Sequence, residues 1–280
     1  MNSSSHPPPG AVEPAGEVDR LQLQSRVWEP SGRRLLNEIG DGRGARALDV
    51  GCGAMCWLRV LSDWVGPDGE VVGTDIDEGM LAAAEHFVTD ESLANVTLVK
   101  DDLFRSALEP SSFDLVHARF QIAPLGRGQE QMAAHLRLVR PGGSVVLEEL
   151  DPLPWHYIPP APALAVPLRR GVEVQGLIPL LGDAFRKAGG DPDAAATQLE
   201  LFHDAGIEVN VRAEVQALPP GHPYLRLPLQ FATALKGVLR SFMDADDLDR
   251  ILGEAERELQ DPDRWGLTFT LVQCWGRRET

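Results

Sequence analysis

The sequence "ALDVGCGAM" at residues 47–55 is the strongest indication of how this chain folds. Its apolar run, residues 46–50, predicts a short buried strand, and Gly51 and Gly53 then predict a tight turn. Neither glycine has a Cβ, so the backbone can turn sharply and approach a ligand closely. A helix is expected over residues 54–65. A strand that leads through a glycine turn into a helix is typical of a nucleotide-binding loop.

Further along the chain, strand patterns alternate with helix patterns. We expect strands over residues 70–76, 95–102, 112–119 and 144–150, with helices over 77–88 and 128–138. Such alternation predicts an α/β fold with a doubly wound, mostly parallel sheet that helices cover on both faces. Upstream, Pro30 interrupts an amphipathic stretch over residues 20–39, so two short helices with a kink are expected there.

The remaining organisation follows from changes in composition. Residues 1–16 are rich in Ser, Pro and Gly, which predicts a disordered tail before a single domain over residues 17–280. Residues 152–167 are rich in proline and aromatic residues, and an insertion of this kind is often a lid over a binding site. We expect the domain to contain cap helices (17–44), a cofactor-binding core (45–151), a helical lid insertion (152–190) and a C-terminal part of the sheet with a helical insertion (191–280).

Charge and cysteine content narrow the class of protein. The net charge of −16 repels phosphate backbones, so nucleic acid is disfavoured as a partner. No apolar run is long enough to span a membrane, and the N-terminus lacks the pattern of a secretory signal. Cys52, Cys56 and Cys274 are too few for a disulfide framework and lack the spacing of a zinc site. We therefore expect a cytoplasmic protein without a metal.

Acidic residues follow or end three of the expected strands. Ligands of open parallel sheets bind beyond the carboxyl ends of the strands, where Asp49, Asp75 and Asp102 are expected. Asp75 lies 26 positions after Asp49, which suits a carboxylate that accepts hydrogen bonds from ribose hydroxyls. Asp102, with the backbone of Leu103 beside it, can accept from an exocyclic amine such as that of adenine. These acids and the glycine turn together predict a working cofactor site.

Five segments in order resemble the motifs of the class I S-adenosylmethionine-dependent methyltransferases: "ALDVGCGAM", "VVGTDIDEGMLAAA", "VTLVKDDLF", "FDLVHARF" and "LRLVRPGGSVVLEE". The resemblance covers about residues 20–150. Near the C-terminus, "IEVNVRAEV" and "TFTLVQCWGRR" resemble the sixth and seventh strands of that fold, the last one antiparallel. The resemblance implies a seven-stranded, Rossmann-like methyltransferase fold with S-adenosyl-L-methionine as cofactor.

The resemblance also implies roles for matching residues. At the adenosine end, Asp75 would take the ribose hydroxyls, Ile76 would pack on the adenine face, and Asp102 and Leu103 would bind the adenine edge. The methionine end would be held by the glycine turn and by residues just past the fourth strand, namely Asp49, Gly51, Cys52, Gly53, Ala118 and Arg119.

The stretch "DRLQLQSRVWEP" resembles the N-terminal helix that closes over the cofactor in many small-molecule methyltransferases. Arg20 and Gln24 are four residues apart and so share a helix face. They would pair with the cofactor carboxylate, Arg20 through charge-assisted hydrogen bonds. The alternative is a solvated amphipathic face.

The chain departs from the family pattern at two places. Met55 stands where the family usually has a third glycine, and Ala123 and Pro124 stand where many small-molecule members have histidines. The candidates for catalysis are therefore His156, in the expected lid, and Glu149, at the end of the fifth strand. For His156 the alternative is a packed or exposed loop histidine.

The sequence thus predicts a methyltransferase that acts on a small, apolar or aromatic metabolite or natural product, as in secondary metabolism. Three alternatives stay open: a non-methylating enzyme such as a cyclase on the same fold, a protein methyltransferase, and a binding protein without activity. The expected partner is a small-molecule acceptor, with neither nucleic acid nor membrane, and a homodimer is left open.

Overall fold

The computed structural model describes residues 14–55, 57–151, 156–158, 161, 163–164, 177–241 and 243–279. The chain divides into two compact units, which are described separately here. The larger unit consists of Val18–Asp151, Asp193–Glu214 and Leu271–Thr280. The smaller unit takes in Pro152–Pro192 and Val215–Thr270. The expected tail falls mostly, and the expected lid partly, outside the described residues.

The larger unit is built on a seven-stranded sheet with the order β3-β2-β1-β4-β5-β10-β7. The pairs among β1 to β5 are parallel, and β10 pairs with β7 in the antiparallel direction. This confirms the expected mostly parallel sheet with an antiparallel last strand. Its strands are β1 (Arg46–Val50), β2 (Glu70–Asp75), β3 (Val96–Lys100), β4 (Phe113–Arg119), β5 (Val139–Asp151), β7 (Asn210–Glu214) and β10 (Thr270–Arg277).

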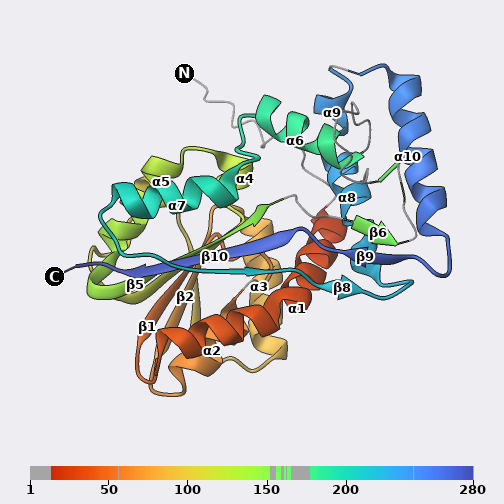
Figure 1. Cartoon of the computed structure of the whole chain (residues 1–280). Coiled ribbons are helices and arrows are strands. Elements are labelled where there is room, and N and C mark those ends of the chain that lie inside the picture. The colour runs from red at the N-terminus through yellow and green to blue at the C-terminus, as the bar shows by residue number, and fades with distance from the viewer. Residues whose placement is uncertain are drawn as a thin grey trace, which may run out of the picture. The chain divides into compact units, whose positions relative to one another are not determined.

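Helices cover both faces of this sheet, as the alternating pattern predicts (Figure 1). One face packs on α1 (Pro14–Ile39), α2 (Leu58–Val65) and α3 (Glu78–Asp90). The other packs on α4 (Ile122–Leu125), α5 (Gly128–Leu138) and α7 (Ala194–Asp204). A short helix, η1 (Leu103–Arg105), follows β3. Each face has its own apolar core, so the polar side chains of the sheet interior are enclosed.

Several boundaries differ from the sequence expectations. A single helix, α1, runs through Pro30, where we expected two helices with a kink. The residues Trp28, Leu35 and Leu36 are buried on both sides of Pro30, and this burial outweighs the loss of one backbone hydrogen bond. The helix after the glycine turn begins only at Leu58, because Ala54 and Met55 still lie in a turn and a bend.

The strand β5 begins five residues earlier than the expected residue 144, at Val139. Its register with β4 shifts between the pairs Phe113–Val139 and Leu115–Ser144. The expected turn over residues 140–143 is therefore an irregularity inside the strand, because more residues of β5 than of β4 span the same length of sheet.

The smaller unit contains a three-stranded antiparallel sheet, β6 (His156–Ile158), β9 (Trp265–Leu267) and β8 (Ala217–Leu218). Its helices are α6 (Leu177–Lys187), η2 (Pro223–Arg226), α8 (Leu227–Ala234), α9 (Lys236–Leu239) and α10 (Ala245–Leu259). The Tyr157 hydroxyl donates to the carbonyl oxygen of Leu225 at 2.8 Å, and Phe185 meets Phe231 edge to face. Among the described residues, no helix is long and apolar enough to cross a membrane.

Candidate cofactor site

The site lies where the direction of the chain through the sheet reverses. From β1 the chain proceeds to β2 and β3 on one side, and later to β4 and β5 on the other. At the carboxyl end of β1, Val50 pairs with Thr74 of β2 and with Ala118 of β4. The residues that follow these three strands therefore meet at one edge of the sheet, which is where ligands of this architecture bind.

The glycine turn takes the conformation that its sequence predicts. Gly51 has φ +60° and Gly53 has φ +54°, both in the left-handed region that favours glycine. The turn is attached to β2 because the Cys52 amide donates to the carbonyl oxygen of Thr74 at 2.8 Å. The Gly53 amide donates to Oδ2 of Asp75 at 3.0 Å. The structure thus brings the turn and the predicted ribose-binding acid together.

Asp75 lies at the tip of β2 with an apolar neighbour. Its Oδ1 accepts from the Asp77 amide at 2.9 Å. Burial raises the pKa of Asp75, and the amides of Asp77 and Gly53 offset only part of that rise. The next side chain, Ile76, is 63% exposed. An acceptor carboxylate beside an exposed apolar surface suits a ribose that carries a flat base.

Asp102 and Leu103 follow β3, next to this corner. The backbone of β3 reaches it through the Asp101 amide, which donates to the carbonyl oxygen of Asp75 at 3.1 Å. The Asp102 carboxylate caps η1 by accepting from the Phe104 amide at 3.0 Å. Leu103 is half-buried and packs against the core. The predicted residues of the adenosine end are therefore on adjacent strand ends.

The helix α1 passes beside the glycine turn. A Cβ placed on Gly53 would lie 3.4 Å from Cδ1 of Leu21. Arg20 and Gln24 lie on either side of Leu21 in this helix and share a helix face, as their spacing predicts. Arg20 Nη1 donates to Oε1 of Gln24 at 2.8 Å. Gln24 is buried, which a fully solvated face would not allow.

Ala118 and Arg119 end β4, and both are buried. Arg119 Nη2 donates to the Ser25 hydroxyl of α1 at 3.0 Å, and its Nε lies 3.8 Å from Oε2 of Glu148. Arg119 therefore connects the N-terminal helix to the centre of the sheet, next to the predicted methionine end.

Asp49 is fully buried beneath the turn. Its Oδ1 lies 2.7 Å from Nδ1 of His117, and its Oδ2 accepts from the Trp57 amide at 3.1 Å. Both carboxylate oxygens are thus bonded to groups inside the protein. Asp49 supports the turn from below and would act on a cofactor through the turn's backbone.

Three further residues surround Asp49: Trp57 and Glu148, which were not predicted to act at the site, and His117, for which the sequence favours a core position in the fourth strand. His117 Nε2 lies 3.4 Å from Oε2 of Glu148, and the Trp57 indole donates to the same oxygen at 2.9 Å. The signal for His117 and Glu148 is the occurrence of polar residues inside the apolar strand sequences "FDLVHAR" and "SVVLEEL". No comparable signal marks Trp57, whose role depends on the folded turn.

Gln121 is a fourth residue that the sequence did not reveal. Its Nε2 donates to the carbonyl oxygen of Val50 at 2.6 Å. A Cβ on Gly51 would lie only 1.6 Å from this nitrogen. The glycine at this position therefore makes room for the Gln121 amide as well as for the turn.

The structure describes the side chain of one catalytic candidate, Glu149, but not that of the other, His156. The Glu149 carboxylate accepts from the amides of Gln121 and Ile122 at 2.9 and 2.6 Å, and so caps α4. His156 begins β6, and its side chain lies outside the described residues. Met55, the departure from the family pattern, is buried.

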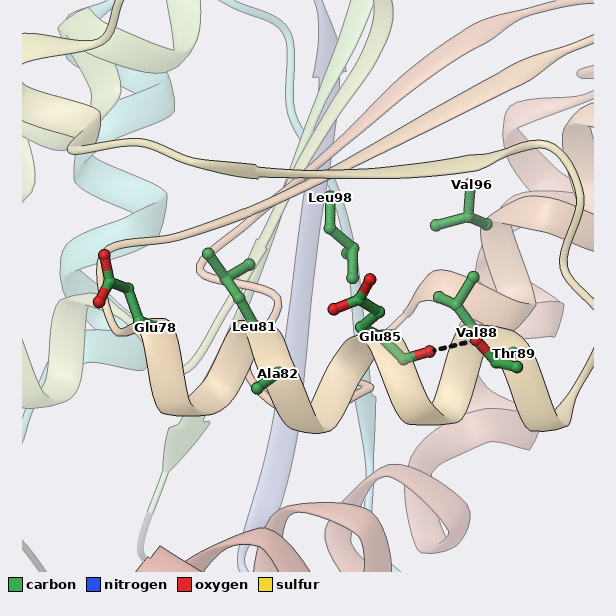
Figure 2. Close-up of a pocket in the computed structure, with 8 residues that line it drawn as sticks. All are labelled: Glu78, Leu81, Ala82, Glu85, Val88, Thr89, Val96 and Leu98. Atoms are coloured by element: carbon green, nitrogen blue, oxygen red, sulfur yellow. Dashed lines mark hydrogen bonds between the residues drawn. The ribbon is translucent and has the colours of Figure 1, made fainter.

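A separate groove of about 460 Å³ lies between α3 and the edge strand β3 (Figure 2). Eight residues line it, none of them predicted to bind the cofactor: Glu78, Leu81, Ala82, Glu85, Val88, Thr89, Val96 and Leu98. In the described ranges, no group of His, Cys, Asp and Glu side chains is arranged to hold a metal ion.

The part of the chain that contains the glycine turn and Asp75 resembles known proteins. A family model described as "Methyltransferase domain" matches residues 47–143. Demethylmenaquinone methyltransferase of Staphylococcus aureus is 36% identical over 126 residues, which are 45% of this chain and 50% of that protein. The chain thus spans about half the length of the curated relatives it matches.

Solved structures share the fold at low identity. A SAM-dependent methyltransferase from Aquifex aeolicus superposes with TM-score 0.52 and 21% identity, covering 75% of this chain and 93% of that one. Phosphoethanolamine N-methyltransferase 2 of Haemonchus contortus, in complex with S-adenosylhomocysteine, gives TM-score 0.53 and 18% identity over 96% of this chain and 61% of its own. Residues 47–143 therefore match a methyltransferase domain, and the solved structures show that the chain shares the fold of S-adenosylmethionine-dependent methyltransferases.

Proposed function

We propose that this chain transfers a methyl group from S-adenosylmethionine to a small, apolar or aromatic metabolite, in the reduced setting of the cytoplasm. One observation carries the proposal: the left-handed glycine turn donates to Asp75, whose carboxylate stands beside the exposed Ile76. Gly51 and Gly53 let the backbone turn tightly beside the strand end, and the acid suits ribose hydroxyls. The residues present therefore fit the cofactor.

When bound, S-adenosylmethionine supplies an electrophilic methyl group to an acceptor oxygen, nitrogen or carbon. The chain's own residues contribute binding and orientation, which supply much of the acceleration in such displacements. Asp75 and Asp102 would hold the ribose and adenine. The glycine turn and the positive charge of Arg119 would orient the methionine end.

A general base is needed only when the acceptor must lose a proton early in the reaction. His156 and Glu149 are our candidates for this role. We expect His156→Ala to lower kcat on a hydroxyl acceptor while the affinity for S-adenosylhomocysteine is unchanged. An equal loss with an acceptor that has no proton to lose would contradict a role as a base.

The apolar character of the acceptor is supported by the name of the curated relative, which gives demethylmenaquinone as that protein's substrate. It is also supported by the aromatic and aliphatic composition of residues 152–185. The test is a panel of acceptors with methyl-labelled cofactor, in which quinones and phenols are matched against polar amines such as phosphoethanolamine. Label on the polar amines alone would overturn the proposed acceptor class.

The first test of the function is calorimetry with S-adenosylmethionine and S-adenosylhomocysteine. We expect both to bind, and Asp75→Asn to weaken both because the amide is a poorer acceptor for two hydroxyls. Glu78→Gln, an exposed substitution on the nearby α3, serves as the control. No binding of either compound at millimolar concentration would overturn the proposal.

A non-methylating enzyme is the second candidate, and the buried Met55 in the turn favours it because the family usually has glycine there. Mass spectrometry of the product distinguishes the two. A product heavier by one methyl group excludes the non-methylating reaction, and label recovered in peptides would instead indicate a protein methyltransferase.

A further inference from the structure

A cluster of polar side chains is enclosed beneath the glycine turn. His117 lies between two carboxylates, with Nδ1 2.7 Å from Asp49 and Nε2 3.4 Å from Glu148. All three side chains are at most 1% exposed. Buried ionised groups persist only when they are paired and hydrogen-bonded, so the cluster constrains the positions of its members.

Trp57 connects this cluster to the turn. Its amide donates to Asp49 at 3.1 Å, its indole donates to Glu148 at 2.9 Å, and its ring stacks on His117 with centroids 3.9 Å apart. Trp57 is the residue immediately before α2, at the far end of the turn that starts at Gly51. These three contacts with the cluster fix the position of Trp57, and with it one end of the turn.

The charges of the cluster balance only when His117 carries a proton. Asp49 from β1 and Glu148 from β5 contribute two negative charges, and Arg119 contributes one positive charge 3.8 Å from Glu148. His135 of α5 is a second buried histidine, and burial and the charge of His117 lower its pKa. Burial lowers the pKa of His117, but the hydrogen bonds and charges of Asp49 and Glu148 outweigh it and raise the pKa.

We propose that His117 is a positioning residue, whose imidazolium joins Asp49 to Glu148 and thereby fixes the glycine turn for the methionine end of the cofactor. This inference rests on the proposed function. Asp75 and Asp102 lie at other strand ends, and Asp75 meets the turn through the Gly53 amide rather than through the cluster, so the adenosine end would depend on His117 less directly than the methionine end. The loss of His117 should therefore weaken the binding of the methionine end more than that of the adenosine end.

The experiment compares two ligands that differ only at that end. S-adenosylhomocysteine has the amino acid portion, whereas 5′-methylthioadenosine lacks it. We expect His117→Gln to weaken S-adenosylhomocysteine roughly tenfold, the scale of one charge-assisted hydrogen bond, and to change 5′-methylthioadenosine by less than about threefold. His135→Gln is the matched control, because it alters another buried histidine of the same unit and should leave the ratio of the two affinities unchanged.

The pH dependence of the ratio of the two affinities is a second measurement. It should change only if the charge of His117, and not just its packing, positions the turn. In the wild type, the preference for S-adenosylhomocysteine over 5′-methylthioadenosine should be lost only on the alkaline side of the usual histidine pKa of 6.5, because the two carboxylates raise the pKa of His117. The preference should stay flat in His117→Gln. Where His117→Gln does not fold, Trp57→Phe keeps the stacked ring but removes the indole hydrogen bond to Glu148, and it should reduce the same preference about threefold.

The outcomes separate the two proposals. Equal weakening of both ligands, or no weakening of either, in the folded variant would show that His117 does not position the turn, while the proposed function would stand. A wild-type protein that binds neither ligand would overturn the proposed function and this inference together.

Discussion

Two histidines buried in the larger unit have pKa values shifted in opposite directions by their surroundings. His117 has carboxylates at both ring nitrogens, which raise its pKa despite burial. His135 is also fully buried, but within the described part of the chain neither of its ring nitrogens has a hydrogen-bond partner. Burial, and then the charge of His117, lower the pKa of His135 to about 3. Two histidines of the same unit thus have pKa values on opposite sides of the usual one.

His135 should make the protein sensitive to acid. Its pKa is about 3 in the folded state and about 6.5 in an unfolded chain, so below pH 6.5 the unfolded state binds the extra proton. Stability should then fall by up to about 1.4 kcal/mol per pH unit from this group alone. We expect His135→Leu to reduce the loss of unfolding free energy between pH 7 and 4.5 by about 2–3 kcal/mol, measured in urea. His86→Leu, an exposed change, is the control, and equal losses in wild type and His135→Leu would contradict the expectation.

The close contact of Gly51 with Gln121 leads to a second prediction at this scale. An alanine Cβ at position 51 would lie 1.6 Å from Nε2 of Gln121, and φ +60° would add strain of about 1–2 kcal/mol. We expect Gly51→Ala to weaken S-adenosylhomocysteine at least about tenfold, and the double variant with Gln121→Ala to recover part of that loss. Calorimetry on the four proteins measures the coupling. Strictly additive effects would mean that the Gln121 side chain is not the obstacle.

Among the elements, α1 contains a helix-breaking proline and also contacts the candidate cofactor site. It lies beside the glycine turn through Leu21 and bonds to Arg119 through Ser25. Pro30 is nevertheless inside it and is exposed. The helix persists because its buried face packs on the larger unit, so Pro30 reduces stability without ending the helix.

Replacing Pro30 should therefore stabilise the protein. We expect Pro30→Ala to raise the unfolding free energy by about 1–3 kcal/mol, because it restores a backbone donor and buries nothing new. Asn37→Ala, also exposed in α1, should gain less than about 1 kcal/mol from helix propensity alone. Urea unfolding compares them. A destabilised Pro30→Ala protein would indicate that the proline shapes the helix in a way that burial does not explain.

At the scale of the whole molecule, the division into two compact units affects how a ligand stabilises it. The candidate site residues between Arg20 and Glu149 belong to the larger unit, whereas His156 belongs to the smaller one. Each unit has its own sheet and its own set of helices. Stabilisation by a cofactor analogue should therefore begin in the larger unit.

Hydrogen exchange and urea unfolding test this expectation. At 100 times its dissociation constant, S-adenosylhomocysteine should raise the unfolding free energy of the larger unit by about 2.7 kcal/mol. Protection should increase in peptides that contain the glycine turn, Asp75 and Asp102. Asp75→Asn should reduce this gain at the same ligand concentration. An increase confined to β6, β8 and β9 would place the ligand elsewhere.

The order of elements in the core was predictable because it depends on local patterns. Strand β1, the glycine turn and the acids at Asp75 and Asp102 were each recognised from neighbouring residues, and the sheet confirms the first five strands. The continuous helix α1 was not predictable, since the local effect of Pro30 is opposed by distant packing. Gln121 was missed for the same reason, because its contact with Gly51 exists only when β1 and β4 are paired.

The amino-acid sequence alone was sufficient for the mostly parallel sheet, the turn and the acids that follow its strands, because apolar periodicity and glycine act over a few residues. The cluster of Asp49, His117 and Glu148 emerged only from the folded molecule. These residues are far apart in the chain, and their charges and pKa values depend on the distances that strand pairing and burial impose.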